Sequence, residues 1–193
     1  MLAVAGYGSR IVRELEKMLP GETILRMQPP YTGHLDGDRY LLCAGVIRPK
    51  TIREQTPEEV RESLSVNLLW PVAFMERLFE ANECARVCVI GSESGYAWSH
   101  DDVYAAGKAA LHRYVETRKL KPQQQLACIA PSIIADAGMT LRRKDRDSLA
   151  QRSQQHPKQR FLTSAEVARA IHFVLYQDEG YYTGQVMRLN GGA

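Results

Sequence analysis

Residues 1–12 read MLAVAGYGSRIV, an apolar run followed by a glycine-containing turn and the first apolar positions of a helix. Residues 1–5 predict a short strand, and apolar residues at helical spacing up to Leu19 predict a helix directly after the turn. A glycine turn at such a junction can bind a pyrophosphate through backbone amides and the helix dipole. The same Gly-x-Gly spacing also occurs in turns that bind nothing, so this stretch alone leaves both interpretations open.

The alternation of strand and helix continues along the sequence. Short apolar and β-branched runs predict further strands at residues 22–27, 39–44, 86–90, 125–130 and 184–189. Capping residues, Thr56 and Thr163 among them, and helical spacing predict helices at residues 56–79, with a kink at Pro71, and at 101–117 and 167–176. Residues 28–38 leave no room for a full crossover helix. We therefore expect one α/β domain over residues 1–193: a doubly wound, Rossmann-like parallel sheet with helices on both faces, shortened in its second crossover.

Composition and charge narrow the class of protein. The 193 residues are 45% apolar and 24% charged, which is typical of one globular domain that needs no disulfide or structural metal. The formal net charge of +3 is small for a nucleic-acid-binding protein. The longest apolar run, residues 68–75, is much shorter than the roughly 18 residues of a membrane span, and no signal-peptide pattern is present. We expect a soluble, cytoplasmic protein with no nucleic-acid or membrane partner.

The cysteines and histidines do not indicate a metal site. The four cysteines lie in apolar stretches without the spacing of metal ligands, so we expect reduced core thiols. They are Cys43, Cys84, Cys88 and Cys128. The five histidines show no spacing typical of metal ligands either. His112 and His172 lie in helical patterns, which favours core or surface positions for them.

Tyr104 and Lys108 lie four residues apart in the predicted helix at residues 101–117, so their side chains share one face. An ammonium group close to a phenol favours the tyrosinate, which acid–base chemistry by tyrosine at neutral pH requires. Such a pair also arises often by chance, so it carries weight only together with other motifs.

Other motifs accompany the pair in a fixed order. The segments are AGYGSRIV (5–12), LCAG (42–45), SVNL (65–68), IGSESG (90–95), YAAGKA (104–109), PSII (131–134), YTGQV (182–186) and NGG (190–192). In this order, over nearly its whole length, the sequence resembles the short-chain dehydrogenase/reductase family. The corresponding family motifs include TGxxxGxG, NNAG, ISSxxG, YxxxKxA, PGxV and TGQ.

The resemblance implies an NAD(P)-dependent oxidoreductase that transfers a hydride between nicotinamide and a small carbonyl or alcohol substrate. It implies that Tyr104 exchanges a proton with the substrate oxygen, that Ser92 orients this oxygen, and that Lys108 lowers the tyrosine pKa and binds the nicotinamide ribose. Asn67 would support Lys108 through a water molecule. Members of this family commonly pair through two long helices, so a homodimer or homotetramer is expected.

The resemblance also implies which residues bind the cofactor. They are Gly6, Gly8, Ser9, Arg10, Ile11, Arg26, Asp36, Ala44, Gly45, Tyr104, Lys108 and Ile134. Arg26 ends the second strand, where a basic residue pairs with the 2′-phosphate of NADP and an acidic one binds the ribose of NAD. NADP(H) is therefore favoured over NAD(H), although Arg26 and Arg10 could also be solvated surface arginines.

Several positions depart from the family pattern. Arg10 and Val12 replace two of the three motif glycines, which puts close approach to a pyrophosphate in question. Leu42 and Cys43 replace the asparagines of NNAG, and Asp136 places an acid near the expected phosphates. These departures keep a second function open, a non-catalytic dinucleotide-binding or scaffold protein on the same fold. A third possibility is an epimerase or dehydratase, which would use the same Tyr104–Lys108 pair and retain its cofactor.

Residues 142–160 contain seven basic and two acidic residues. By the resemblance, these residues correspond to the family's segment that covers the substrate. Their positive charge could therefore attract an acidic substrate or the cofactor phosphates. A charged, glutamine-rich stretch is also typical of a mobile solvated loop. The sequence does not indicate the substrate, because loop side chains determine it.

Overall fold

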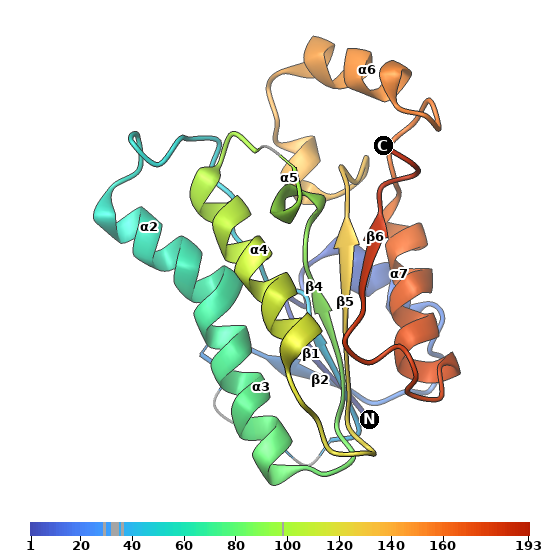
Figure 1. Ribbon diagram of the computed structural model, residues 1–193. Coiled ribbons are helices and arrows are strands. Elements are labelled where there is room, and N and C mark those ends of the chain that lie inside the picture. Colours follow the sequence, from blue (N-terminus) through green and yellow to red (C-terminus); the bar gives the residue numbers. More distant parts are fainter. Residues whose placement is uncertain (29, 32–34, 36, 98) are drawn as a thin grey trace.

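The protein forms one six-stranded parallel sheet with helices on both faces (Figure 1). The computed structural model describes residues 1–28, 30, 31, 35, 37–97 and 99–193. The strands are β1 Leu2–Ala5, β2 Ile24–Met27, β3 Arg39–Leu42, β4 Arg86–Ile90, β5 Gln125–Pro131 and β6 Val186–Leu189, in the order β2-β1-β3-β4-β5-β6. All neighbouring strands pair in parallel. The doubly wound architecture that the sequence predicted is confirmed.

Period-two alternation along each strand divides the apolar core between the two faces of the sheet. One core cluster packs strand residues such as Val87 and Val89 against α3 Trp70–Ala81 and α4 Asp102–Thr117. The other packs strand residues such as Cys88 and Ile90 against α1 Arg10–Glu16 and α7 Ser164–His172. The apolar stripe in α3, expected to serve core or dimer packing, lies in the first cluster.

The chain changes its winding direction between β1 and β3. Both β2 and β3 pair with β1, one on each side, with Ala5 level with Met27 and with Leu42. No helix lies between β2 and β3 among the described residues, which confirms the shortened crossover. Ligands of open α/β sheets bind outside the carboxyl ends of the strands at such a switch point. Figure 1 shows α5 (Gly138–Leu141) and the starts of α2 (Pro57–Leu64) and α4 at this end.

The long helix expected at residues 56–79 is divided into three parts. It consists of α2 Pro57–Leu64, a π-helical turn at Ser65–Leu69, and α3. Proline has no N–H group, and in a regular α-helix the ring of Pro71 would clash with the carbonyl group four residues earlier. The wider turn lies directly before Pro71, where the sequence predicted a kink. The predicted cap at Thr56 is present as a capping box with Glu59.

Three local expectations need correction. Residues 142–160, for which a solvated loop was one expectation, include the largely exposed helix α6 Arg146–Gln155, which follows the short α5 Gly138–Leu141. The last helix ends at His172 and continues as a π-helical turn, Phe173–Gln177. Cys84 is exposed rather than in the core, because it lies in the turn before β4. In the described part of the chain, no helix is long and apolar enough to cross a membrane.

Candidate active site

The four predicted catalytic side chains come from three elements and are all buried at the carboxyl end of the sheet. Tyr104 and Lys108 lie one turn apart on α4, Ser92 follows β4, and Asn67 lies in the π-helical turn between α2 and α3. Their exposed fractions are 8% for Tyr104, 3% for Lys108, 8% for Ser92 and 1% for Asn67. The fold therefore removes four polar side chains from water in one region, which is costly unless they serve each other or a ligand.

Ser92 and Tyr104 form the central contact of this group. The Tyr104 phenol lies within hydrogen-bonding reach of the Ser92 side chain. Burial raises the pKa of Tyr104, the Ser92 hydrogen bond partly opposes that shift, and the Asp101 charge adds to it. The phenol therefore carries its proton at neutral pH. This differs from the sequence-based expectation that Lys108 lowers the pKa, because desolvation of the phenolate is the largest effect here.

Lys108 is held by the end of β4. Its Nζ donates a hydrogen bond of 2.7 Å to the carbonyl oxygen of Ile90 and lies 5.7 Å from the centre of the Tyr104 ring. Burial lowers the pKa of Lys108 to about 8, so the amine is mostly protonated at pH 7. The structure thus places an ammonium group beside the phenol, as the i, i+4 spacing predicted.

Asn67 joins this group to the loop that follows β3. Its Nδ2 donates to the carbonyl oxygen of Val46 (2.8 Å), and its Oδ1 accepts from the Val46 amide (3.2 Å). A Cβ on Gly45 would lie 3.2 Å from Asn67 Oδ1 and 4.0 Å from Lys108 Nζ. Gly45 therefore marks the point where Asn67, Lys108 and the end of β3 meet. Ala44, the residue before it, is partly buried.

His112, which the sequence analysis placed only in core or surface, contacts the Ser92 loop directly. Its Nε2 accepts a hydrogen bond of 3.3 Å from the Ser92 amide. Burial lowers the pKa of His112 to about 4, so the ring is neutral and able to accept at pH 7. A Cβ on Gly91 would lie 2.3 Å from His112 Nε2, and one on Gly95 would lie 2.6 Å from its Cε1. The two glycines, spaced around Ser92, are the sequence signal of this buried ring.

The glycine turn packs closely against the end of β3. Gly6 has φ +79°, and a Cβ there would lie 2.6 Å from the Ala44 amide nitrogen. A Cβ on Gly8 would have no atom within 4 Å. Ser9 caps α1 by accepting a hydrogen bond of 3.2 Å from the Val12 amide. The first glycine is therefore required by the fold, whereas the second faces open space.

The two arginines predicted to bind cofactor both have partners. Arg26 is exposed and lies over the Tyr7 ring, 3.7 Å from its centre, so its guanidinium is held at the carboxyl end of β2. Arg10 forms an ion pair with Asp136 in which Nε and Oδ2 are 3.1 Å apart. Asp136 also accepts hydrogen bonds from the Ser164 amide and hydroxyl. Two departures from the family pattern thus neutralise each other.

The remaining side chains that were predicted to bind the cofactor are less accessible to a ligand. The Ile11 side chain is buried in the core, so only its backbone can face a ligand. Ile134 is 9% exposed and forms a bridge with Leu162. Asp36 lies outside the described residues. Within the described residues, no group of three or more potential ligands could hold a metal ion.

Comparisons with known proteins identify a family model and several relatives that are similar to this chain. A family model described as enoyl-(acyl carrier protein) reductase matches residues 31–193. An acetoacetyl-CoA reductase from Acinetobacter sp. (strain RA3849) is 24% identical over 156 residues, 77% of this chain and 62% of the relative. The 3-oxoacyl-[acyl-carrier-protein] reductase MabA from Mycobacterium avium is 29% identical over 156 residues, 77% of this chain and 60% of the relative. The chain thus spans about 60% of the length of these two relatives.

Solved structures share the fold at lower identity. A short-chain dehydrogenase family protein from Francisella tularensis superposes with a TM-score of 0.84 at 17% identity, covering 99% of this chain and 97% of that one. Levodione reductase superposes with a TM-score of 0.82 at 16% identity, covering 99% of this chain and 96% of that one. At these identities the likeness shows the fold alone.

Proposed function

Because the chain belongs to the short-chain dehydrogenase/reductase family, we propose that it is an NAD(P)-dependent oxidoreductase that interconverts a carbonyl group and an alcohol. The observation that carries this proposal is the shared burial of Ser92 and Tyr104, which come from different elements and whose side chains lie within reach of each other, with Lys108 one turn further along α4. The hydroxyl group of Ser92, the phenol of Tyr104 and the amine of Lys108 differ in proton affinity. Their arrangement suits proton transfer to a substrate oxygen.

In the direction of reduction, the residues of this chain supply the proton and position the oxygen. The chemistry that a nicotinamide cofactor would supply here, when bound, is hydride transfer. Tyr104, protonated at neutral pH because burial raises its pKa, donates its proton to the carbonyl oxygen. Ser92 donates a hydrogen bond to the same oxygen and stabilises the charge that develops on it. Lys108 binds the ribose hydroxyls and returns a proton towards the phenol.

The glycine and arginine positions support a dinucleotide as the cofactor. Gly8 has open space in place of a side chain, and Gly45 leaves the region beside Lys108 free of one. Arg10 lies at the start of α1, next to the glycine turn. Arg26, held by Tyr7, favours NADP(H) over NAD(H), because a guanidinium pairs well with a 2′-phosphate. A homo-oligomer and a cytoplasmic location remain part of this proposal by family resemblance.

Replacing Arg26 by alanine is expected to weaken NADPH binding by roughly tenfold or more and to leave NADH binding within twofold. A charge-assisted hydrogen bond is worth about 1.5–3 kcal/mol, and only NADPH carries the phosphate that would form it. Fluorescence titration with both cofactors measures the difference. Arg77→Ala, which removes an exposed arginine from α3, is the matched control. Equal weakening for both cofactors would contradict the assignment of Arg26 to the phosphate.

Turnover of carbonyl compounds with NADPH tests the proposal as a whole. The named relatives make 3-oxoacyl thioesters the first substrates to try, followed by smaller ketones and aldehydes. We expect NADPH oxidation that depends on both the carbonyl compound and the enzyme. Folded protein that binds neither NADPH nor NADH below millimolar concentration would instead favour a non-catalytic scaffold. The observation that supports this alternative is that Arg10 and Val12 stand where the family motif has glycine.

A further inference from the structure

We propose that Asp101 is a positioning residue for Tyr104: its buried carboxylate ties the loop after β3 to the first turn of α4 and so determines where the phenol stands. The inference rests on the proposed function, in which Tyr104 is the proton donor. It concerns a residue outside every motif by which the sequence resembles its family.

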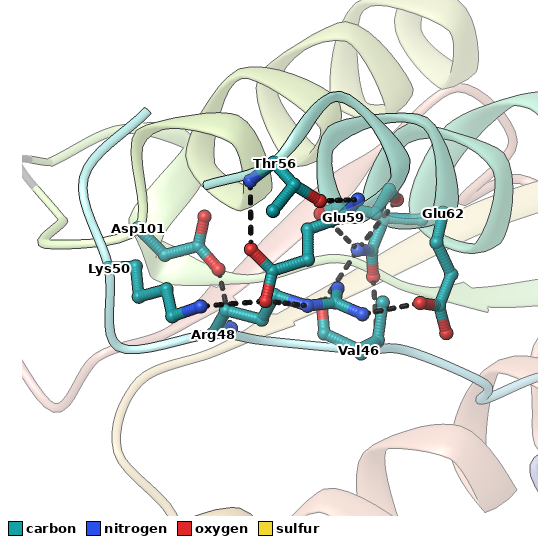
Figure 2. Close-up of polar contacts among 9 residues, drawn as sticks. Val46, Arg48, Lys50, Thr56, Glu59, Glu62 and Asp101 are labelled. Atoms are coloured by element: carbon teal, nitrogen blue, oxygen red, sulfur yellow. Dashed lines mark hydrogen bonds and ion pairs between the residues drawn. The ribbon is translucent and has the colours of Figure 1, made fainter. Parts of the chain in front are cut away.

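The contacts of Asp101 join two separate parts of the site. The side chain is 2% exposed and caps α4. Its Oδ1 accepts hydrogen bonds of 3.0 Å from the Tyr104 amide and from Gln55 Nε2. Its Oδ2 accepts one of 2.6 Å from the Arg48 amide (Figure 2). One carboxylate therefore holds the backbone of Tyr104 and two points on the loop at residues 46–55.

That loop is fixed firmly enough to serve as a reference for the helix. Asn67 binds both backbone groups of Val46, and the side chain of Arg48 pairs with Glu62 on α2 (Figure 2). Lys50 pairs with Glu59 on the same helix, with Nζ and Oε1 2.7 Å apart. Because the loop is anchored to α2 and to the Asn67 turn, Asp101 transmits its position to the start of α4.

Asp101 accepts more hydrogen bonds than capping a helix requires. A serine or threonine satisfies an N-cap with one hydrogen bond to the third residue of the helix, as Thr56 does for α2. Asp101 makes this bond and two more, all from uncharged N–H groups, while the loop cations Arg48 and Lys50 are paired with α2. The carboxylate thus stays close to Tyr104 without a cation of its own in these contacts.

The charge of Asp101 has an effect that shape alone would not have. It contributes to the raised pKa of Tyr104, after burial. Besides Asp101, the phenol faces Lys108 on its own helix and the thiols of Cys43 and Cys128. Burial raises the pKa of Cys43 and raises that of Cys128 to about 12, so both thiols are neutral at pH 7. Removing the Asp101 charge should therefore lower the pKa of Tyr104.

Asp101→Asn separates charge from shape, because an amide oxygen can still accept from Tyr104 and Gln55, whereas the amide nitrogen opposes the Arg48 N–H. We expect kcat to fall by roughly tenfold and NADPH affinity to stay within twofold. We expect the pH profile of turnover to shift to lower pH by about half a unit or more. The tyrosinate absorbance of Asp101→Asn, with the Tyr104→Phe titration subtracted, should shift in the same direction, and this readout does not depend on turnover.

Asp102→Asn is the matched control. Asp102 is exposed, lies in the first turn of α4, and accepts a hydrogen bond of 3.2 Å from Ile52 of the same loop, but it does not hold Tyr104. Its replacement should leave kcat and the pH profile unchanged. If Asp101→Asn does not fold, Asp101→Ser retains a good helix cap without the charge and takes its place.

The outcomes separate this inference from the proposed function. Reduced stability of the Asp101 variant with unchanged kcat, pH profile and tyrosinate titration would show a cap and nothing more, and would overturn the inference. A wild-type protein without turnover on any carbonyl compound would overturn the proposed function, while a shifted tyrosinate titration would still support the link between Asp101 and Tyr104.

Discussion

Tyr104→Phe is expected to reduce NADPH-dependent turnover by about a thousandfold and to leave NADPH binding within severalfold. Phenylalanine keeps the buried ring and removes only the hydroxyl group, which lies within reach of Ser92. General acid catalysis by a positioned side chain contributes roughly 10²–10⁴-fold. The hydroxyl group of Ser92 cannot take over as proton donor, because an aliphatic alcohol is a far weaker acid than a phenol. Steady-state rates and a fluorescence titration with NADPH measure the two effects.

Tyr96→Phe is the matched control for Tyr104→Phe. Tyr96 lies close to the same loop, stacked on His112, but its side chain is 44% exposed. Its hydroxyl group has no part in the proposed proton transfer, so turnover should stay within severalfold. Full activity in Tyr104→Phe would reject the assigned proton donor, and equal losses in the two variants would show a general disturbance of the loop instead.

The order of strands and helices could be predicted because each element carries its own periodic signal. The strand at residues 86–90 was predicted at the bounds that β4 has, and the caps at Thr56 and Thr163 are present as capping boxes. The shortened crossover followed from the small number of residues between the second and third strands. The π-helical turn at Ser65–Leu69 could not be predicted, because it depends on how Pro71 is accommodated and on the contacts that Asn67 makes with the loop after β3.

The candidate site was predictable only as far as motifs reach. The sequence named Ser92, Tyr104 and Lys108, and the structure places them together. It could not give the direction of the Tyr104 pKa, because that depends on burial and on Asp101 more than on the spacing to Lys108. The ion pair between Arg10 and Asp136 joins residues that are far apart in the sequence, so local sequence patterns could not predict it either.

The two glycines of the first turn are expected to respond in opposite ways to the same substitution. Gly6→Ala should lower the free energy of unfolding by roughly 3 kcal/mol or prevent folding. At φ +79° an L-residue costs about 1–2 kcal/mol, and the new Cβ would lie 2.6 Å from backbone atoms of residues 43 and 44, which cannot yield as a flexible side chain can. Urea denaturation followed by circular dichroism measures the loss.

Gly8→Ala should leave the free energy of unfolding unchanged or raise it by up to about 1 kcal/mol, because its Cβ meets no atom within 4 Å and the unfolded chain loses freedom. The open space beside Gly8 is then of use only to a ligand, so NADPH binding should weaken by roughly tenfold or more. A stable Gly8→Ala protein with unchanged NADPH affinity would mean that the glycine turn does not hold the cofactor. Because Gly6→Ala should affect the fold and Gly8→Ala the binding of a ligand, this pair of variants separates a turn required for packing from one used for binding, which the Gly-x-Gly spacing alone could not do.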